Sequence, residues 1–138
     1  MNTVALALVH VWLSAAPPAA LAGLPRVGDE VDVTAGAVTA LSCALAARDR
    51  AQLGALTSCS YAEAKAGIVV YDVAERLVYR LAGKRVALWQ LESAFGGGSV
   101  DLIGKVVQVD RKSGVVVVDV EELTVTPKPK AGSFKGCL

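Results

Sequence analysis

The chain has 138 residues and a formal net charge of +1 at pH 7, and 54% of its residues are hydrophobic. This length suits one domain with a core of its own. The near-balance of charge excludes a long-range field that would attract nucleic acid or an anionic membrane surface. We therefore expect no nucleic-acid partner.

Residues 1–22 predict a removable export signal. They contain no Lys, Arg, Asp or Glu, and their apolar centre has the length of a signal-peptide h-region. Pro17-Pro18 would break a helix, and Ala20-Leu21-Ala22 has the small-x-small pattern that signal peptidase cuts. A membrane anchor needs about 20 unbroken apolar residues, so we expect no stable anchor. The sequence predicts a periplasmic or secreted protein.

Cleavage of this signal would change the chemistry available to the protein. The single His of the chain, His10, lies inside the signal. Without it, nucleophilic catalysis lacks its usual base, and a Ser-Lys pair remains as a formal option. Gly96-Gly97-Gly98 leads into a strand and does not have the spacing of a phosphate loop. We expect no catalytic residues, no cofactor and no enzyme activity.

After a lead-in over residues 23–29, the sequence alternates as a half-buried strand does. The polar face has Glu30, Asp32 and Thr34. The other face is expected to be buried and consists of Val31, Val33, Ala35, Ala37 and Leu41. Gly36, in the middle, is a place where a long strand can bend or form a bulge.

The next segment predicts helices. Residues 44–66 are rich in Ala, Leu and Arg, with an interruption near Gly54. Ser60-Tyr61-Ala62-Glu63 fits a capping box, and Gly67 is a natural stop, so a short helix is expected over Tyr61–Ala66.

Two hairpins and one helix complete the expected elements. The first hairpin pairs residues 68–73 with 77–81. A helix is expected over residues 86–95, where Val86, Trp89 and Ala94 recur at helical spacings. The second hairpin and the tail are expected as strand 100–109 with Gly104 inside it, turn 110–114 with Gly114 in the left-handed position, return strand 115–123 and basic extended tail 124–138.

This order predicts an all-β fold with short helices. Five strands, a bent first strand and a helix before the last pair suit a five-stranded OB-like Greek-key barrel. The helical segment after the first strand is an insertion into that plan. The domain is expected to cover residues 30–123.

Three short motifs stand out along the chain: Thr39-Ala40-Leu41-Ser42-Cys43, then Cys59 with Gly67, then Val100-Asp101-Leu102-Ile103-Gly104-Lys105-Val106. In these motifs the chain resembles a family of small secreted bacterial proteins with an OB-like domain. The resemblance spans roughly residues 31–123 and implies a fold and a compartment, with no reaction attached. Family members often carry another Cys about four residues after the second, where this chain has Glu63. The resemblance therefore implies no metal site.

Three cysteines lie outside the expected signal: Cys43, Cys59 and Cys137. In an oxidising compartment a pair tends to be bridged and an odd thiol is left over. A structural Cys43–Cys59 disulfide is favoured, and pairing of Cys137 with either partner is its main competitor. Cys137, near the end of the chain, could also form an intermolecular bridge or be capped and inert.

Tyr71 and Tyr79 are the candidate ligand-binding residues. The hairpin assignment has them facing each other across two strands, on a surface where OB domains stack ligands. The alternative is a cross-strand aromatic pair that partly covers the core. The acidic clusters Asp29-Glu30-Asp32 and Glu121-Glu122 are interpreted as solvated strand positions and strand ends.

The leading hypothesis from sequence is an exported, non-enzymatic OB-like domain that binds a protein or small-ligand partner in the cell envelope. The alternative hypothesis is a thiol-based metal-binding or redox accessory protein of the periplasm, in which thiolates supply the soft ligands.

Overall fold

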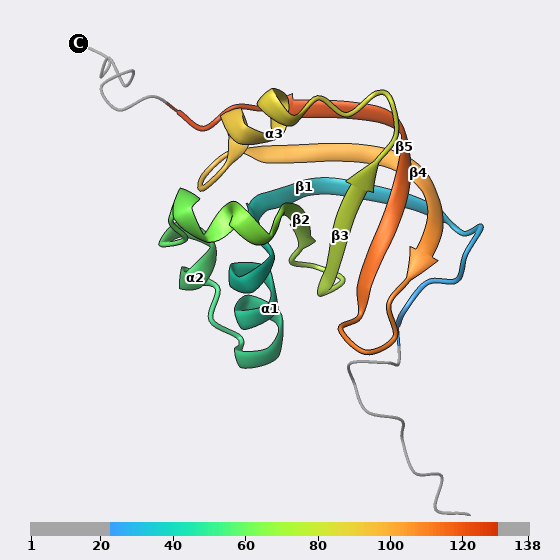
Figure 1. Ribbon diagram of the computed structural model, residues 1–138, viewed down its shortest axis with the longest axis horizontal. Helices are drawn as coiled ribbons and strands as arrows, with labels where there is room; N and C mark the ends of the chain where they lie inside the picture. Colours follow the sequence, from blue (N-terminus) through green and yellow to red (C-terminus); the bar gives the residue numbers. More distant parts are fainter. Residues whose placement is uncertain (1–22, 130–138) are drawn as a thin grey trace, which may run out of the picture.

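The computed structural model describes residues 23–129 (Figure 1). Five strands close into a barrel in the order β1-β2-β3-β5-β4. The strands are β1 (Glu30–Ala40), β2 (Ile68–Asp72), β3 (Leu77–Ala82), β4 (Ser99–Val109) and β5 (Val115–Thr126). Strands β3 and β5 pair in parallel, and the other neighbours pair antiparallel. The expected five-stranded OB-like barrel is confirmed.

The helices lie where the sequence places them. They are α1 (Leu41–Arg50), α2 (Gly54–Thr57), the 3-10 helix η1 (Tyr61–Ala66) and α3 (Leu88–Ala94). The first three form the insertion after β1 and gather on one side of the barrel, whereas α3 lies between β3 and β4 in the chain (Figure 1). Both the helical insertion and the later helix were expected.

Strand β1 contains the bulge predicted around Gly36. Its register with β4 shifts between Val33 and Gly36, and Ala35 has a positive φ of 54°. The Ala35 N–H donates a hydrogen bond of 2.7 Å to Asp101 Oδ1. A Cβ at Gly36 would lie 2.5 Å from a methyl group of Val70, so the close approach of the two strands requires glycine here.

Because of the bulge, the buried face predicted for this strand is wrong beyond Val33. An inserted residue reverses the alternation beyond it. Ala35 is therefore exposed, and Val38 and Ala40 are buried. Leu41 does not continue the strand, because it begins α1.

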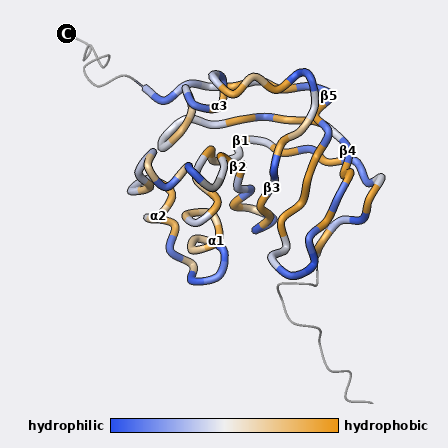
Figure 2. Tube along the Cα trace, viewed as in Figure 1, coloured by the Kyte–Doolittle hydropathy of each residue, from blue (hydrophilic) through white to orange (hydrophobic). Residues whose placement is uncertain are grey.

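Two large apolar clusters hold the domain together, and a third, small one surrounds the Cys43–Cys59 pair. The first fills the barrel interior with side chains from all five strands and from α3, including Val33, Val100 and Leu102. The second lies between α1 and the outer face of β2, β3 and β5, where Ala44 and Ala47 pack on the strands. Figure 2 shows the matching hydrophobic stretches along the strands and along α1.

The last strand is longer than predicted. It continues to Thr126, three residues past the expected boundary at Leu123, because Val125 and Thr126 pair with the start of β4. The Lys128 N–H then donates a 2.8 Å hydrogen bond to the Ser93 carbonyl of α3. The expected leader, residues 1–22, and the end of the tail with Cys137 lie outside the described residues. Within residues 23–129, none of the helices has the length and apolar character needed to cross a bilayer.

Candidate functional site

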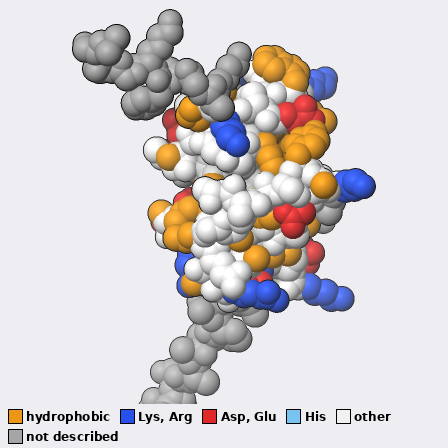
Figure 3. Space-filling model, turned by 90° about the vertical axis from the view of Figure 1, so that its left-hand side faces the viewer, with side chains coloured by type: hydrophobic (Ala, Val, Ile, Leu, Met, Phe, Trp, Pro, Cys, Tyr) orange, Lys and Arg blue, Asp and Glu red, His pale blue; other side chains and the backbone are white. Residues whose placement is uncertain are grey.

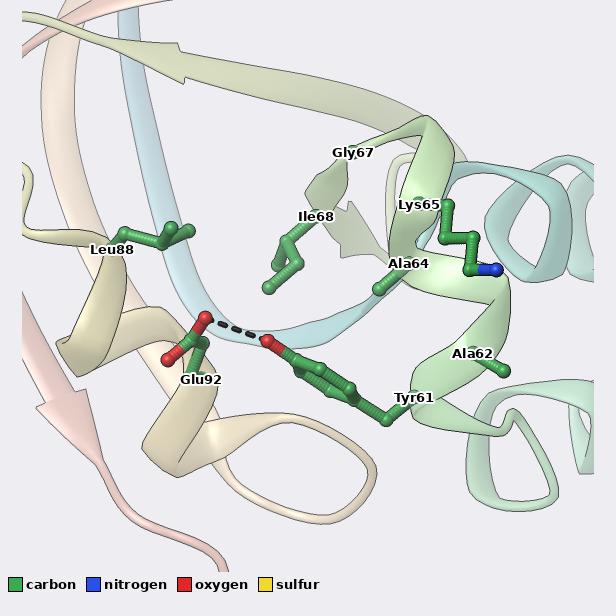
Figure 4. Close-up of a pocket in the computed structure, with 8 residues that line it drawn as sticks. All are labelled: Tyr61, Ala62, Ala64, Lys65, Gly67, Ile68, Leu88 and Glu92. Atoms are coloured by element: carbon green, nitrogen blue, oxygen red, sulfur yellow. Dashed lines mark hydrogen bonds between the residues drawn. The ribbon is translucent and has the colours of Figure 1, made fainter.

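A groove with a volume of about 400 Å³ lies between η1 and α3. Its lining is mostly apolar, and the start of β2 contributes to it (Figure 4). The lining residues are Tyr61, Ala62, Ala64, Lys65, Gly67, Ile68, Leu88 and Glu92. This volume lies in the range of ligand-binding pockets.

Local sequence signals position the η1 wall. The predicted capping box is present: the Ser60 side chain accepts from the backbone at Glu63, and Glu63 Oε2 accepts from the Ser60 N–H at 3.0 Å. Gly67 ends the helix with a φ of 116°, which a side chain would disfavour, and turns the chain into β2. The helix expected over Tyr61–Ala66 is thus confirmed, as a 3-10 helix.

Tyr61 joins the two walls of the groove. Its hydroxyl donates a 2.6 Å hydrogen bond to Glu92 Oε1 on α3, as the dashed line in Figure 4 marks. Its ring meets Phe95 edge to face, with ring centroids 5.6 Å apart. The hydrogen bond to the Glu92 carboxylate raises the pKa of Tyr61 above its ordinary value. The groove therefore has fixed walls and a carboxylate inside it.

The α3 rim of the groove exposes large apolar side chains. Leu88 is 61% exposed and the adjacent Trp89 is 69% exposed. Figure 3 views this side of the molecule and shows groups of hydrophobic side chains interleaved with a few charged ones. The helix expected over residues 86–95 is confirmed as α3. Trp89, one of its helically spaced apolar residues, is exposed and does not pack in the core.

A second cluster surrounds the disulfide. Cys43 on α1 and Cys59 in the loop before η1 are bonded, as predicted, with Cα atoms 6.0 Å apart. Glu63 Oε2 lies 3.2 Å from Cys43 Sγ. In the disulfide this sulfur carries no proton, so the approach is a contact; a reduced Cys43 thiol can donate a hydrogen bond there.

A hollow of about 180 Å³ adjoins this cluster and is lined by Ser42, Cys43, Ala46, Ala55, Ser58, Cys59 and Glu63. Ligand atoms from the two cysteines and from Glu63 all lie within 4.8 Å of one another. The pairing of the cysteines is predicted by the sequence, whereas Glu63 is expected only to cap the helix. Its position one helical turn after Cys59 was the available signal.

The two tyrosines expected to bind ligand do not form a surface. Tyr71 pairs with Val78 and Tyr79 pairs with Val70, so the rings lie at adjacent register positions on opposite faces of the hairpin. Tyr71 is 1% exposed beneath α1, and Tyr79 is 4% exposed in the barrel interior. The expectation that they face each other is wrong, and neither ring offers a stacking platform to solvent.

One residue from each acidic cluster lies beside the same small hollow. Asp32, Asp101 and Glu122 come together with Leu102, Ile103 and Thr124 around about 100 Å³. Asp32 and Glu122 are exposed, and Asp101 holds the bulge of β1 through the Ala35 N–H. Asp32 lines a solvated strand face, as expected. The expectation that Glu121-Glu122 ends a strand is wrong, because β5 continues past them to Thr126.

Comparison with known proteins adds no relative: no protein-family model, no curated protein and no solved structure matches the chain. The assignment of function therefore rests on the geometry of the groove between η1 and α3 and of the cluster formed by Cys43, Cys59 and Glu63.

Proposed function

We propose that this protein is a non-enzymatic binding domain of the cell envelope that holds an apolar, basic segment of a protein partner in the groove between η1 and α3. The observation that carries the proposal is the apolar groove itself, with Leu88 and Trp89 exposed on its rim. Exposed apolar surface of this kind, bordered by polar residues, is typical of protein interaction sites. The leader-like sequence of residues 1–22 and the disulfide support an oxidising compartment.

The shape of the groove favours a peptide segment over a small molecule. Small-molecule sites enclose most of their ligand. Here Leu88 and Tyr61, which line the groove, are themselves mostly exposed, and the apolar surface continues outside it onto Trp89. A chain segment can fill the groove with one side chain and cover Trp89 with the next.

The charges of the groove specify the segment further. Glu92 places a carboxylate among the apolar lining, next to the Tyr61 hydroxyl. The Lys65 ammonium points away from it in Figure 4. A Lys or Arg beside the apolar side chains of the partner would therefore meet an opposite charge, whereas an acidic residue would be repelled.

Selection from a random dodecapeptide library tests this proposal on the full chain. The selected peptides should combine large apolar residues with Lys or Arg. Their affinity, measured by fluorescence anisotropy, should fall at least about tenfold in Trp89→Ala or Leu88→Ala, as for an anchoring side chain. Val107→Ala is the matched control, because Val107 is an exposed apolar residue on β4, outside the groove. Equal binding by the groove and control variants would refute the proposal.

Two other occupants of the groove give different results. If residues 130–138 of the same chain occupy it, their deletion will raise peptide affinity at least about tenfold, since a competitor is removed. If a second copy occupies it, sedimentation will show a dimer that Trp89→Ala dissociates. Either result would replace the partner segment as the occupant.

A further inference from the structure

We infer that reduction of the Cys43–Cys59 disulfide creates a divalent metal site, with the two thiolates and the Glu63 carboxylate as ligands and Zn²⁺ as the preferred ion. The three ligand atoms already lie within 4.8 Å of one another in the oxidised protein. This site goes beyond the peptide groove and does not depend on it.

The ligand set matches the chemistry of zinc. Zn²⁺ binds thiolate sulfur at about 2.3 Å and carboxylate oxygen at about 2.0–2.2 Å, in tetrahedral geometry. Two thiolates on one such ion are about 3.8 Å apart, a separation that is available once the S–S bond is broken. Cu(I) would be held by the sulfurs alone and would gain little from a carboxylate.

The local structure allows the rearrangement. Cys43 is fixed on α1 and Glu63 on η1, but Cys59 lies in the irregular loop between α2 and η1. The adjoining hollow of about 180 Å³ gives the ion space, with room for a water as the fourth ligand. Glu63 Oε2 both accepts from the Ser60 N–H and approaches Cys43 Sγ. A carboxylate oxygen has two lone pairs, so Oε2 can keep the cap while it binds the ion.

The chemistry balances with an external thiol as reductant. A thiolate attacks one sulfur of the disulfide, the S–S bond breaks, and its electron pair leaves on the other cysteine as a thiolate. A second thiol resolves the mixed disulfide, so that two thiols are oxidised to one disulfide and the protein gains two thiols. Binding of Zn²⁺ then replaces the two thiol protons, which pass to solvent.

Metal titration of the reduced full chain tests this inference. The protein is reduced with a phosphine, and the phosphine is removed under anaerobic conditions. The reduced protein is then titrated with Co²⁺ while the thiolate-to-cobalt charge-transfer absorption is recorded. We expect one ion per chain, displacement by Zn²⁺, and no absorption band in the disulfide form. The double variant Cys43→Ser, Cys59→Ser should lose the band, and Cys137→Ser should keep it.

Glu63→Gln tests the third ligand. Gln can still cap the helix, but it lacks the negative charge, so metal affinity should fall at least about tenfold. Glu121→Gln removes an exposed carboxylate on β5, outside the cluster, and should leave the affinity unchanged. Circular dichroism of each reduced variant reports the fold; if reduction unfolds the chain, Zn²⁺ should restore the spectrum of the wild type. The inference would be overturned if the reduced protein showed no cobalt charge-transfer band, or if Cys137→Ser abolished that band. An unchanged metal affinity in Glu63→Gln would overturn it as well.

Discussion

The Tyr61 hydroxyl and the Glu92 carboxylate are joined by a 2.6 Å hydrogen bond across 31 residues of sequence. Tyr61 belongs to the insertion after β1, whereas Glu92 lies on the helix between β3 and β4. The Tyr61–Glu92 hydrogen bond joins η1 to α3, and the Tyr61 ring also contacts Phe95, which directly follows α3. These two contacts define the width of the groove.

Removing the carboxylate should lower the pKa of Tyr61. The hydrogen bond to Glu92 is the main cause of its raised value, because an ionised Tyr61 loses the donor and faces a negative charge. In Glu92→Gln we expect Tyr61 to titrate at lower pH, as followed by NMR of ¹³C-labelled tyrosine. Glu121→Gln, an exposed change on β5, is the control. An unchanged Tyr61 titration in Glu92→Gln would show that the bond does not form in solution.

The disulfide should contribute measurably to stability. It closes a loop with a sequence separation of 16 residues and ties the loop before η1 to α1 within the helical insertion. The chain-entropy model gives about 3 kcal/mol for such a loop. Urea unfolding of Cys43→Ser, Cys59→Ser should show a loss of this size relative to wild type, with Cys137→Ser unchanged. A thiol assay on the denatured wild type should find one free thiol per chain. A loss of stability in Cys137→Ser would contradict the assigned pairing.

The barrel could be predicted because its signals are local. Alternation along the strands, the capping box at Ser60 and the Gly114 turn each fix one element from a few neighbouring residues. The order of elements then leaves few topologies. The bulge at Gly36 was also readable, because a glycine inside a long alternating strand marks a bend or a close approach.

The register of the first hairpin depends on one turn residue and was missed. Strand β2 ends at Asp72, whose side chain accepts from the Ala74 and Glu75 N–H groups, and Arg76 takes a left-handed φ of 55°. This four-residue turn shifts the pairing by one position from the expected one, and a shift of one exchanges the faces of the strand. Tyr71 is then opposite Val78 and not opposite Tyr79.

The groove could not be predicted because its walls meet only in three dimensions. Helical spacing of Val86, Trp89 and Ala94 describes an apolar face equally well whether a helix is covered or left open. The structure leaves Trp89 exposed because the barrel interior is already filled by the strands and by Leu91 and Ala94. No local pattern relates Tyr61 to Glu92.

Thr39→Val should stabilise the protein. The Thr39 side chain is fully buried, and its hydroxyl has no hydrogen-bond partner among the described residues. Valine keeps the shape and removes the cost of burying an unpaired hydroxyl, so the free energy of unfolding should rise by about 1 kcal/mol. Thr34→Val, an exposed change on the same strand, should stay within about 0.5 kcal/mol of wild type in urea unfolding. Destabilisation by Thr39→Val would mean that the hydroxyl has a partner in solution.

Alkaline unfolding should depend on Tyr79. Burial in the barrel interior, with the nearby Asp72 and Glu75 charges adding to it, raises the pKa of Tyr79 from 10.0 to about 12. Between these values the unfolded chain releases the proton and the folded chain keeps it. The stabilising contribution of the neutral ring is therefore complete below pH 10 and decreases as the pH rises towards 12.

The contribution of Tyr79 to the free energy of unfolding should decrease by about 1–2 kcal/mol over this pH range. Urea unfolding at pH 9 to 11.5, about the range set by this pKa, measures it. In Tyr79→Phe, which keeps the ring and removes the ionisable group, the dependence on pH should be weaker by that amount. Tyr71→Phe, with Tyr79 intact, should retain it. A Tyr79→Phe curve parallel to the wild-type curve would mean that the hydroxyl ionises as readily in the folded barrel as in the unfolded chain.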